Sequence, residues 1–364
     1  MASSSSPIVK VKPFFSNNNT RISSLHASTS YFPLPSSITK FFNKTKFATT
    51  ITAMAQPQRS AMQYNQVGDS NLVVSEITFG TMTFGEQNTE KVAHEMLSYA
   101  CEHGINTLDT AEMYPIPMKK ETQGLTDIYI GNWLKSRPRD QVIGKPGRYV
   151  GLFGEFFYDP SKWRQSVPFI EQLRAFQELI NEGKVRYIGV SNETSYGVME
   201  FIHAAKTEGL PKIVSIQNSY SLIARCKFEV DLVEVCHPNN CNVGLLCYSP
   251  LAGGALTGKY LDIESEAAKN GRLQLFPGYM ERYNNEATSQ YIEMAKKHGL
   301  SPVELALGFV RDRPFMTSTI IGATSVQQLK EDIDAFLTTE RPLPPDVMTD
   351  IETIFKRYKD PTTF

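Results

Sequence analysis

The chain has 364 residues, 41% of them hydrophobic and 21% charged, which suits one large α/β domain or two medium ones. Its formal net charge is -1, but residues 1–54 hold six Lys and Arg and no acid, which leaves 31 basic against 38 acidic residues in the rest of the chain. An acidic body without a basic cluster argues against binding of nucleic acid, so we expect a small-molecule substrate. Five irregularly spaced cysteines predict neither a disulfide framework nor a metal site, and no apolar run could span a bilayer.

The first 54 residues are rich in Ser, Thr and Asn, with scattered basic residues and no Asp or Glu. This composition is typical of a transit peptide, and it predicts import into a plastid, with a mitochondrion as the alternative. We therefore divide the chain into a plastid transit peptide (1–54), one catalytic domain (62–340) and a C-terminal helix and tail (341–364).

Alternating strands and helices are predicted from residue 62 onward. Turn residues at 68–71 indicate a hairpin, a strand ends at Gly80, and a helix runs from its N-cap Thr89 to His103, where Gly104 stops it. Further strands are predicted at 105–109, 185–190, 213–217, 243–248 and 319–321. This alternation indicates a parallel sheet, either a TIM barrel or a doubly wound fold, and the lack of a G-x-G-x-x-G motif after an early strand favours the barrel.

Asp109 lies at the end of a predicted strand, and Tyr114 lies in the loop that follows, where barrel enzymes build their active sites. By themselves these residues could equally be a helix cap and a packing residue. Similar segments recur in order along the chain, at 80–85, 108–114, 189–192, 217–218, 248–254 and 322–332. Together they resemble the aldo-keto reductase family, near the group that includes the potassium-channel β subunits.

The resemblance implies a TIM (β/α)8 barrel that reduces aldehydes or ketones to alcohols with NADPH. Tyr114 would donate the proton and Asp109 would support it, while Ser191, Asn192 and Gln217 would bind the nicotinamide carboxamide. The remaining matches would contact the ring, the phosphates and the adenosine. The implied cofactor-binding residues are Thr81, Met82, Asp109, Ser191, Asn192, Gln217, Tyr248, Ser249, Pro250, Leu251, Gly253, Lys259, Arg272, Gly322, Thr324, Gln328, Glu331 and Asp332. The family usually has Asn where this chain has Asp332.

Two other motif interpretations fail on single residues. The run from Gly253 to Lys259 matches most of a phosphate-binding P-loop, but Tyr260 stands where Ser or Thr would bind Mg²⁺. The sequence around Ser191 lacks the second Gly of a hydrolase nucleophile elbow.

The resemblance also implies a Lys at the end of the third strand and a His at the end of the fourth. No His occurs between His103 and His203, and from Arg148 the chain resembles the loop that follows the fourth strand. We therefore predict that most of strand 3, helix 3 and strand 4 is missing, which leaves six strands. The second and fifth strands would then either pair directly or leave unpaired edges beside 105–109. Lys145 would come two or three residues too early, roughly 7 to 10 Å along the strand, and we interpret it as a surface residue.

These gaps predict little or no carbonyl reductase activity, and restoration of a strand-helix-strand segment between Ile143 and Arg148 should recover it. The alternative function is a catalytically dead NADPH-binding protein or a poorly folded variant. The sequence specifies neither the substrate nor the oligomeric state.

Overall fold

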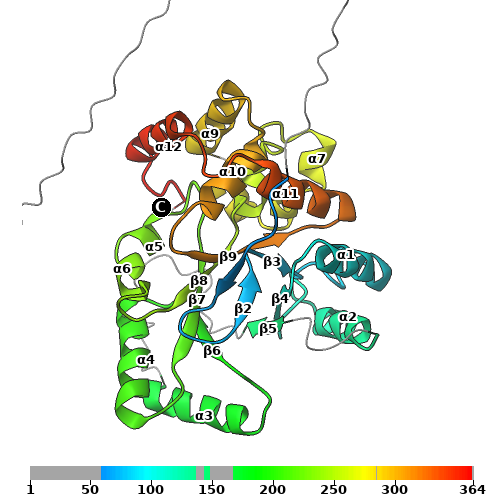
Figure 1. The fold of residues 1–364 in the computed structure, drawn as a ribbon. Helices are drawn as coiled ribbons and strands as arrows, with labels where there is room; N and C mark the ends of the chain where they lie inside the picture. The colour runs from blue at the N-terminus through cyan, green and yellow to red at the C-terminus, as the bar shows by residue number, and fades with distance from the viewer. Residues whose placement is uncertain (1–58, 137–142, 148–166, 284, 363–364) are drawn as a thin grey trace, which may run out of the picture. The chain divides into compact units, whose positions relative to one another are not determined.

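The structure is a computed structural model that describes residues 59–136, 143–147, 167–283 and 285–362 (Figure 1). All of them belong to one compact unit, residues 55–364. Its strands are β1 (Tyr64–Gln66), β2 (Val73–Ser75), β3 (Ile77–Gly80), β4 (Thr107–Ala111), β5 (Ile143–Gly147), β6 (Ile188–Ser191), β7 (Ile213–Ser219), β8 (Gly244–Tyr248) and β9 (Met316–Gly322).

The helices include two short 3₁₀ segments, η3 and η4. In chain order they are α1 (Glu90–Glu102), α2 (Leu125–Leu134), α3 (Phe169–Asn181), α4 (Ser195–Glu208), α5 (Cys226–Glu229), α6 (Leu232–Cys236), η3 (Ala252–Thr257), α7 (Glu266–Lys269), η4 (Arg272–Leu275), α8 (Pro277–Tyr283), α9 (Glu286–Lys297), α10 (Pro302–Arg311), α11 (Val326–Thr338) and α12 (Pro345–Arg357).

A single parallel sheet organises the unit. Its seven strands lie in the order β5-β4-β3-β9-β8-β7-β6, and β1 with β2 forms a separate antiparallel hairpin. Every neighbouring pair in the large sheet is parallel, so the carboxyl ends of all seven strands lie at the same edge. The fold is α/β, with a curled parallel sheet consistent with an incomplete TIM barrel.

Two expectations about the sheet need correction. We predicted six strands, and β5 is a seventh; it keeps five residues of the strand that we took to be mostly missing. Beside 105–109 we predicted either direct pairing of the second and fifth strands or an unpaired edge, and neither occurs, because β5 pairs with β4 along its whole length. Within the described residues the edge strands of the sheet are therefore β5 and β6. Pro146 suits an edge strand because it lacks the backbone N–H that a central strand needs for pairing on both sides.

Several element ends follow from local sequence. The Thr89 side chain accepts from Val92 N at the start of α1, and Gly104 adopts a φ of 89° just after its end, which confirms both predicted limits. The hairpin at 68–71 is also confirmed. The strand predicted to begin at Val185 begins at Ile188 instead, because Val185 N donates to Leu179 O at the end of α3.

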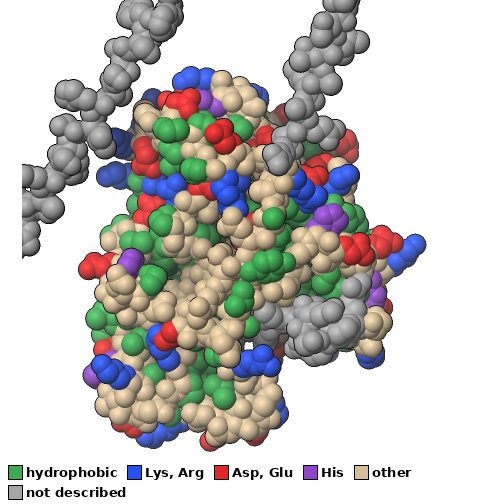
Figure 2. Space-filling view, viewed as in Figure 1, with side chains coloured by type: hydrophobic (Ala, Val, Ile, Leu, Met, Phe, Trp, Pro, Cys, Tyr) green, Lys and Arg blue, Asp and Glu red, His purple; other side chains and the backbone are tan. Residues whose placement is uncertain are grey.

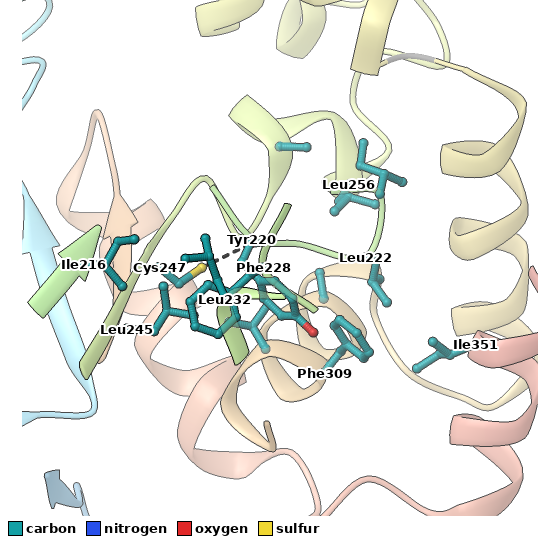
Figure 3. Close-up of a cluster of buried hydrophobic side chains, with 14 of the residues drawn as sticks. Ile216, Tyr220, Leu222, Phe228, Leu232, Leu245, Cys247, Leu256, Phe309 and Ile351 are labelled. Atoms are coloured by element: carbon teal, nitrogen blue, oxygen red, sulfur yellow. Dashed lines mark hydrogen bonds between the residues drawn. The ribbon is translucent and has the colours of Figure 1, made fainter. Parts of the chain in front are cut away.

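Two apolar clusters fill the unit. One joins β3, β4 and β9 to α1, α2 and α11, and includes Phe79, Met96 and Ile333. The other surrounds β6, β7 and β8, where Tyr220, Phe228 and other side chains pack closely (Figure 3). The site at the strand ends therefore rests on a well-packed base on both sides of β9.

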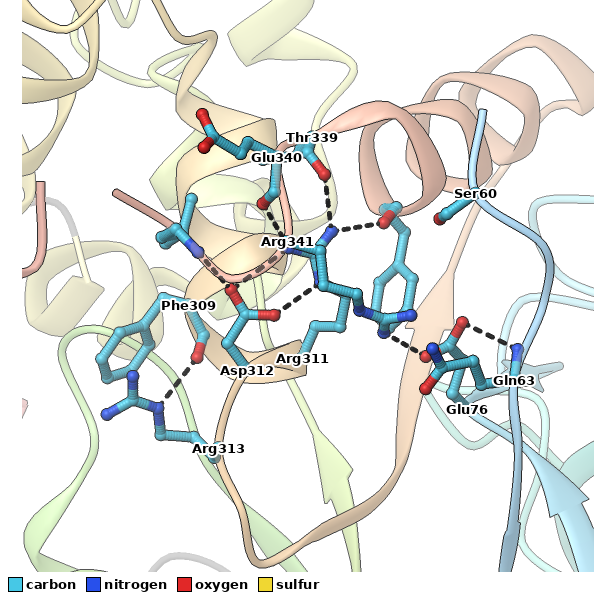
Figure 4. Close-up of polar contacts among 12 residues, drawn as sticks. Ser60, Gln63, Glu76, Phe309, Arg311, Asp312, Arg313, Thr339, Glu340 and Arg341 are labelled. Atoms are coloured by element: carbon cyan, nitrogen blue, oxygen red, sulfur yellow. Dashed lines mark hydrogen bonds and ion pairs between the residues drawn. The ribbon is translucent and has the colours of Figure 1, made fainter. Parts of the chain in front are cut away.

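The amino ends of β3 and β9 carry a polar network instead. Arg311 donates to three backbone carbonyl oxygens and pairs with Asp312, while Arg341 pairs with Glu76 just before β3 (Figure 4). Each of these carboxylates also accepts a backbone N–H, from Leu343 and from Gln63 respectively.

The described helices include none that is both long and apolar enough to cross a membrane. On the face shown in Figure 2, acidic and basic side chains are interspersed. Residues 1–54 lie outside the described residues, and the transit peptide stays a prediction.

Candidate active site

The predicted site residues lie at the carboxyl edge of the sheet. Because the strands are parallel, residues far apart in sequence meet there. Ser191, Tyr248 and Gly322 are the last residues of β6, β8 and β9, and Asp109 in β4 and Gln217 in β7 lie two residues before the ends of their strands.

Asp109 and Tyr114 form the chemical centre of this edge. Asp109 is 6% exposed, and Gln217 Nε2 donates to its Oδ1 at 2.7 Å. Burial, followed by the charge of Asp109 and a hydrogen bond to it, raises the pKa of Tyr114 well above its ordinary value, while Arg272 acts in the opposite direction. In this environment the Tyr114 phenol keeps its proton and releases it reluctantly.

The loop after β3 positions this pair. Thr81 donates to the Asp109 carbonyl oxygen from its backbone N at 3.1 Å and from its Oγ1 at 2.8 Å. Ile116 N donates to Met82 O at 3.1 Å, which ties the loop that carries Tyr114 to the same segment. Of the two residues predicted to bind the cofactor in this loop, Thr81 therefore contacts the Asp109 backbone, and Met82 contacts the loop two residues after Tyr114.

The backbone of Lys145 lies in the middle of β5. In the β4–β5 pairing its partner is Asp109, and neighbouring strands are separated by roughly 4.8 Å. The predicted displacement is measured from the position where the family carries its Lys, so this pairing does not test it and it stays a prediction. The stretch from 148 to 163, which resembled the loop after the fourth strand, lies outside the described residues.

The residues expected around a nicotinamide ring are linked to one another. Ser191 Oγ and Asn192 N both donate to Gln217 O at 3.0 Å, and Tyr248 OH donates to Asn192 Oδ1 at 2.9 Å. Asn192 N also donates to Asn218 Oδ1 at 2.9 Å, and Asn192 adopts a left-handed φ of 54°. Our sequence analysis gave Asn218 no role, although it directly follows Gln217.

The turn after β8 leads into a basic region that we call the cationic cradle, formed by Gly253, Gly254, Lys259, Arg272 and Gly322. A Cβ on Gly254 would lie 2.8 Å from Lys259 Nζ, and one on Gly322 would lie 3.4 Å from Arg272 Nη2. Burial lowers the pKa of both basic groups. Among the described residues neither side chain forms an ion pair, so two half-buried cations lie close against glycines, where a larger residue would crowd them.

The backbone that leads into the cradle is irregular. Ser249 has a φ of 56°, and Pro250 and Leu251 connect it to η3, where Gly253 has a φ of 64°. Tyr260 OH accepts from Leu273 N at 3.0 Å, which anchors η4 and with it Arg272. Tyr260, which excluded a P-loop, is thus a positioning residue.

The start of α11 closes the site. Thr324 donates to Gln328 Oε1 from both its N and its Oγ1 at 2.9 Å, and Asn88 Nδ2 donates to Thr324 O at 2.7 Å. Glu331 is exposed and accepts from a neighbouring side chain on its own helix, whereas Asp332 is 7% exposed and faces inward. Asn88 was missed in the sequence because nothing there connects it to residue 324.

Comparison with known proteins agrees with this geometry. The family described as Aldo/keto reductase family matches residues 76–145 and 160–356. Protein tas of Escherichia coli is 39% identical over 351 residues, covering 82% of this chain and 99% of that protein. An aldo-keto reductase of Babesia bovis is 41% identical over 200 residues, covering 52% of this chain and 70% of that protein. A probable voltage-gated potassium channel subunit beta of Arabidopsis thaliana is 28% identical over 310 residues, covering 75% of this chain and 91% of that protein.

The chain therefore belongs to the aldo/keto reductase family of oxidoreductases. The family match is interrupted between residues 145 and 160. The alignment with Protein tas has 351 positions, whereas 82% of this chain is about 298 residues, so about 50 aligned positions have no counterpart here.

Proposed function

We propose that this protein reduces an aldehyde or ketone to an alcohol with NADPH, at a turnover well below that of a relative that carries the missing segment. The observation that carries the proposal is the meeting, at one edge of the sheet, of the Tyr114–Asp109 pair with a polar set from β6, β7 and β8 and with the cationic cradle.

The residues present fit the nucleotide. The cradle combines two basic side chains without an ionic partner among the described residues with glycines that let a phosphate chain approach the backbone. Arg272 and Thr324 would hold the 2′-phosphate that distinguishes NADPH from NADH, with Lys259 on the pyrophosphate. Ser191, Asn192 and Gln217 would hold the carboxamide, and Tyr248 would lie against the ring.

The bound cofactor would supply hydride to the carbonyl carbon of the substrate. The chain's own contribution is the proton at the carbonyl oxygen, donated by Tyr114. Asp109 accepts from Gln217, so the proton donor and the carboxamide-binding set are held in one connected arrangement. Arg272 is the positive charge that lowers the pKa of Tyr114, against burial and the charge of Asp109, which raise it.

NADPH oxidation with a panel of aldehydes and ketones tests the proposal. The unaltered protein should show low but measurable turnover, and Tyr114→Phe should abolish it while leaving NADPH affinity within about twofold, because the phenol oxygen belongs to the proton-transfer step. Equal turnover by both proteins would exclude Tyr114 as the donor and contradict the mechanism.

A second candidate function is NADPH binding without turnover. It is favoured by the lack of any His between His103 and His203, since a His that positions the substrate oxygen is part of the family's usual arrangement. Saturable NADPH fluorescence quenching together with zero oxidation of every substrate in the panel would establish this candidate in place of the first.

We also propose that the protein is a plant plastid member of its family, because its first 54 residues contain no acid and are rich in hydroxylated side chains. N-terminal sequencing of the protein from leaves should find a mature start at about residue 50 to 55. A mature protein that begins at Met1 would contradict the proposal.

A further inference from the structure

Asp332 is a buried carboxyl group without a partner. It lies on α11 and is 7% exposed, and among the described residues its carboxylate makes no hydrogen bond and no ion pair. Two other buried acidic side chains are satisfied differently, since Glu76 and Asp312 each bind an arginine and a backbone N–H (Figure 4). A lone buried carboxylate is costly, so the environment of Asp332 calls for an explanation.

Three charged groups act on Asp332. Glu331 on its own helix repels the carboxylate, while Lys259, after η3, and Arg272, on η4, attract it. Both cations belong to the cationic cradle. Burial outweighs their attraction and, with Glu331, raises the pKa of Asp332 to about 7.

The other elements packed against α11 bring no further charge to this carboxyl group. The contacts of α1 and α10 with α11 are made largely by apolar side chains such as Met96, Leu307 and Ile333. Arg311 of α10 binds Phe336 O, a turn farther along, and pairs with Asp312. The protonation of Asp332 is therefore set by the cradle and by Glu331.

We propose that Asp332 takes up one proton from solvent when NADPH binds, so that a neutral carboxyl group faces the nucleotide. This inference rests on the proposed function of the cradle. Nucleotide phosphates would draw Lys259 and Arg272 into their own ion pairs and place further negative charge near the carboxylate. The added proton binds to a carboxylate oxygen of Asp332 and gives the group an O–H with which to donate a hydrogen bond.

The consequence is a nucleotide affinity that depends on pH. Above the pKa of the free protein the proton must be acquired during binding, so the NADPH dissociation constant should rise by up to about tenfold per pH unit. Asp332→Asn has nearly the same shape and always carries donors, so its affinity should be independent of pH over this range.

Isothermal titration of NADPH at pH 8, in buffers with different ionisation enthalpies, measures the proton directly. At this pH the 2′-phosphate is fully ionised, because its second pKa is about 6. The unaltered protein should take up close to one proton per nucleotide, and its dissociation constant should rise severalfold between pH 7.5 and 8.5. Asp332→Asn should take up almost none. Asp334→Asn, on the same helix, is the matched control and should behave like the unaltered protein.

The outcomes separate the two proposals. NADPH binding without proton uptake, or uptake that persists in Asp332→Asn, overturns the role of Asp332 and leaves the proposed function standing. Failure of the unaltered protein to bind NADPH overturns both.

Discussion

Replacement of Asp332 by Asn should change how the stability of the free protein depends on pH. The pKa of this buried carboxyl group is raised from 3.8 to about 7, chiefly by desolvation. The folded state therefore binds more protons than the unfolded chain between about pH 4 and pH 7, and stability falls as the pH rises through this window. Three pKa units at 1.36 kcal/mol each give about 4 kcal/mol as the largest contribution.

Urea unfolding of the mature protein at pH 4.5, 6 and 8 measures this effect. Asp332→Asn should match the unaltered protein at pH 4.5 and exceed its free energy of unfolding at pH 8, by up to about 4 kcal/mol. Asp334 lies on the same helix as Asp332, and its partly exposed carboxylate pairs with Arg59. Asp334→Asn therefore controls for the loss of one negative charge. A difference between Asp332→Asn and the unaltered protein that stays constant from pH 4.5 to pH 8 would refute the reasoning.

Three further substitutions test the site. Arg272→Met should weaken NADPH binding at least tenfold, as expected for loss of a charge-assisted hydrogen bond, and leave NADH affinity nearly unchanged; equal losses in fluorescence titrations would contradict the 2′-phosphate assignment. Lys145→Met should leave aldehyde turnover and NADPH affinity nearly unchanged, as expected for a surface residue, whereas a loss of turnover of about a hundredfold would identify Lys145 as a cation that assists Tyr114. Gly254 has a φ of 96°, and a Cβ there would lie 2.8 Å from Lys259 Nζ, so Gly254→Ala should lower the melting temperature and the NADPH affinity. A Cβ on Gly278 would meet nothing within 4 Å, so Gly278→Ala should change neither.

Features determined by local chemistry could be predicted from the sequence. The ends of α1 follow from Thr89 and Gly104, and the hairpin follows from its turn residues, because caps and turns depend on a few neighbouring groups. The grouping of Asp109 with Gln217 was also accessible, since parallel strands bring their carboxyl ends to one edge.

Features determined by long-range pairing could not be predicted. Lys145 lies in register with Asp109 because β5 pairs with β4, and the residue count along the chain does not give this register. β6 begins at Ile188 and not at the predicted Val185, because the Val185 N–H donates to Leu179 O at the end of α3. The environment of Asp332 depends on cations more than 50 residues away in sequence, so the carboxyl group looked like a simple departure from the family's Asn.

We propose that this chain keeps the cofactor site and the proton donor of its family but lacks part of the machinery that makes the donor efficient. Steady-state NADPH oxidation, compared between this chain and one with the corresponding segment of Protein tas inserted after β5, tests it most directly. General acid–base assistance contributes on the order of 10² to 10⁴ in rate, and we expect a gain of this size in the restored chain, with Tyr114→Phe abolishing turnover in both. Equal turnover with and without the segment would contradict the claim and show that the residues already present complete the active site.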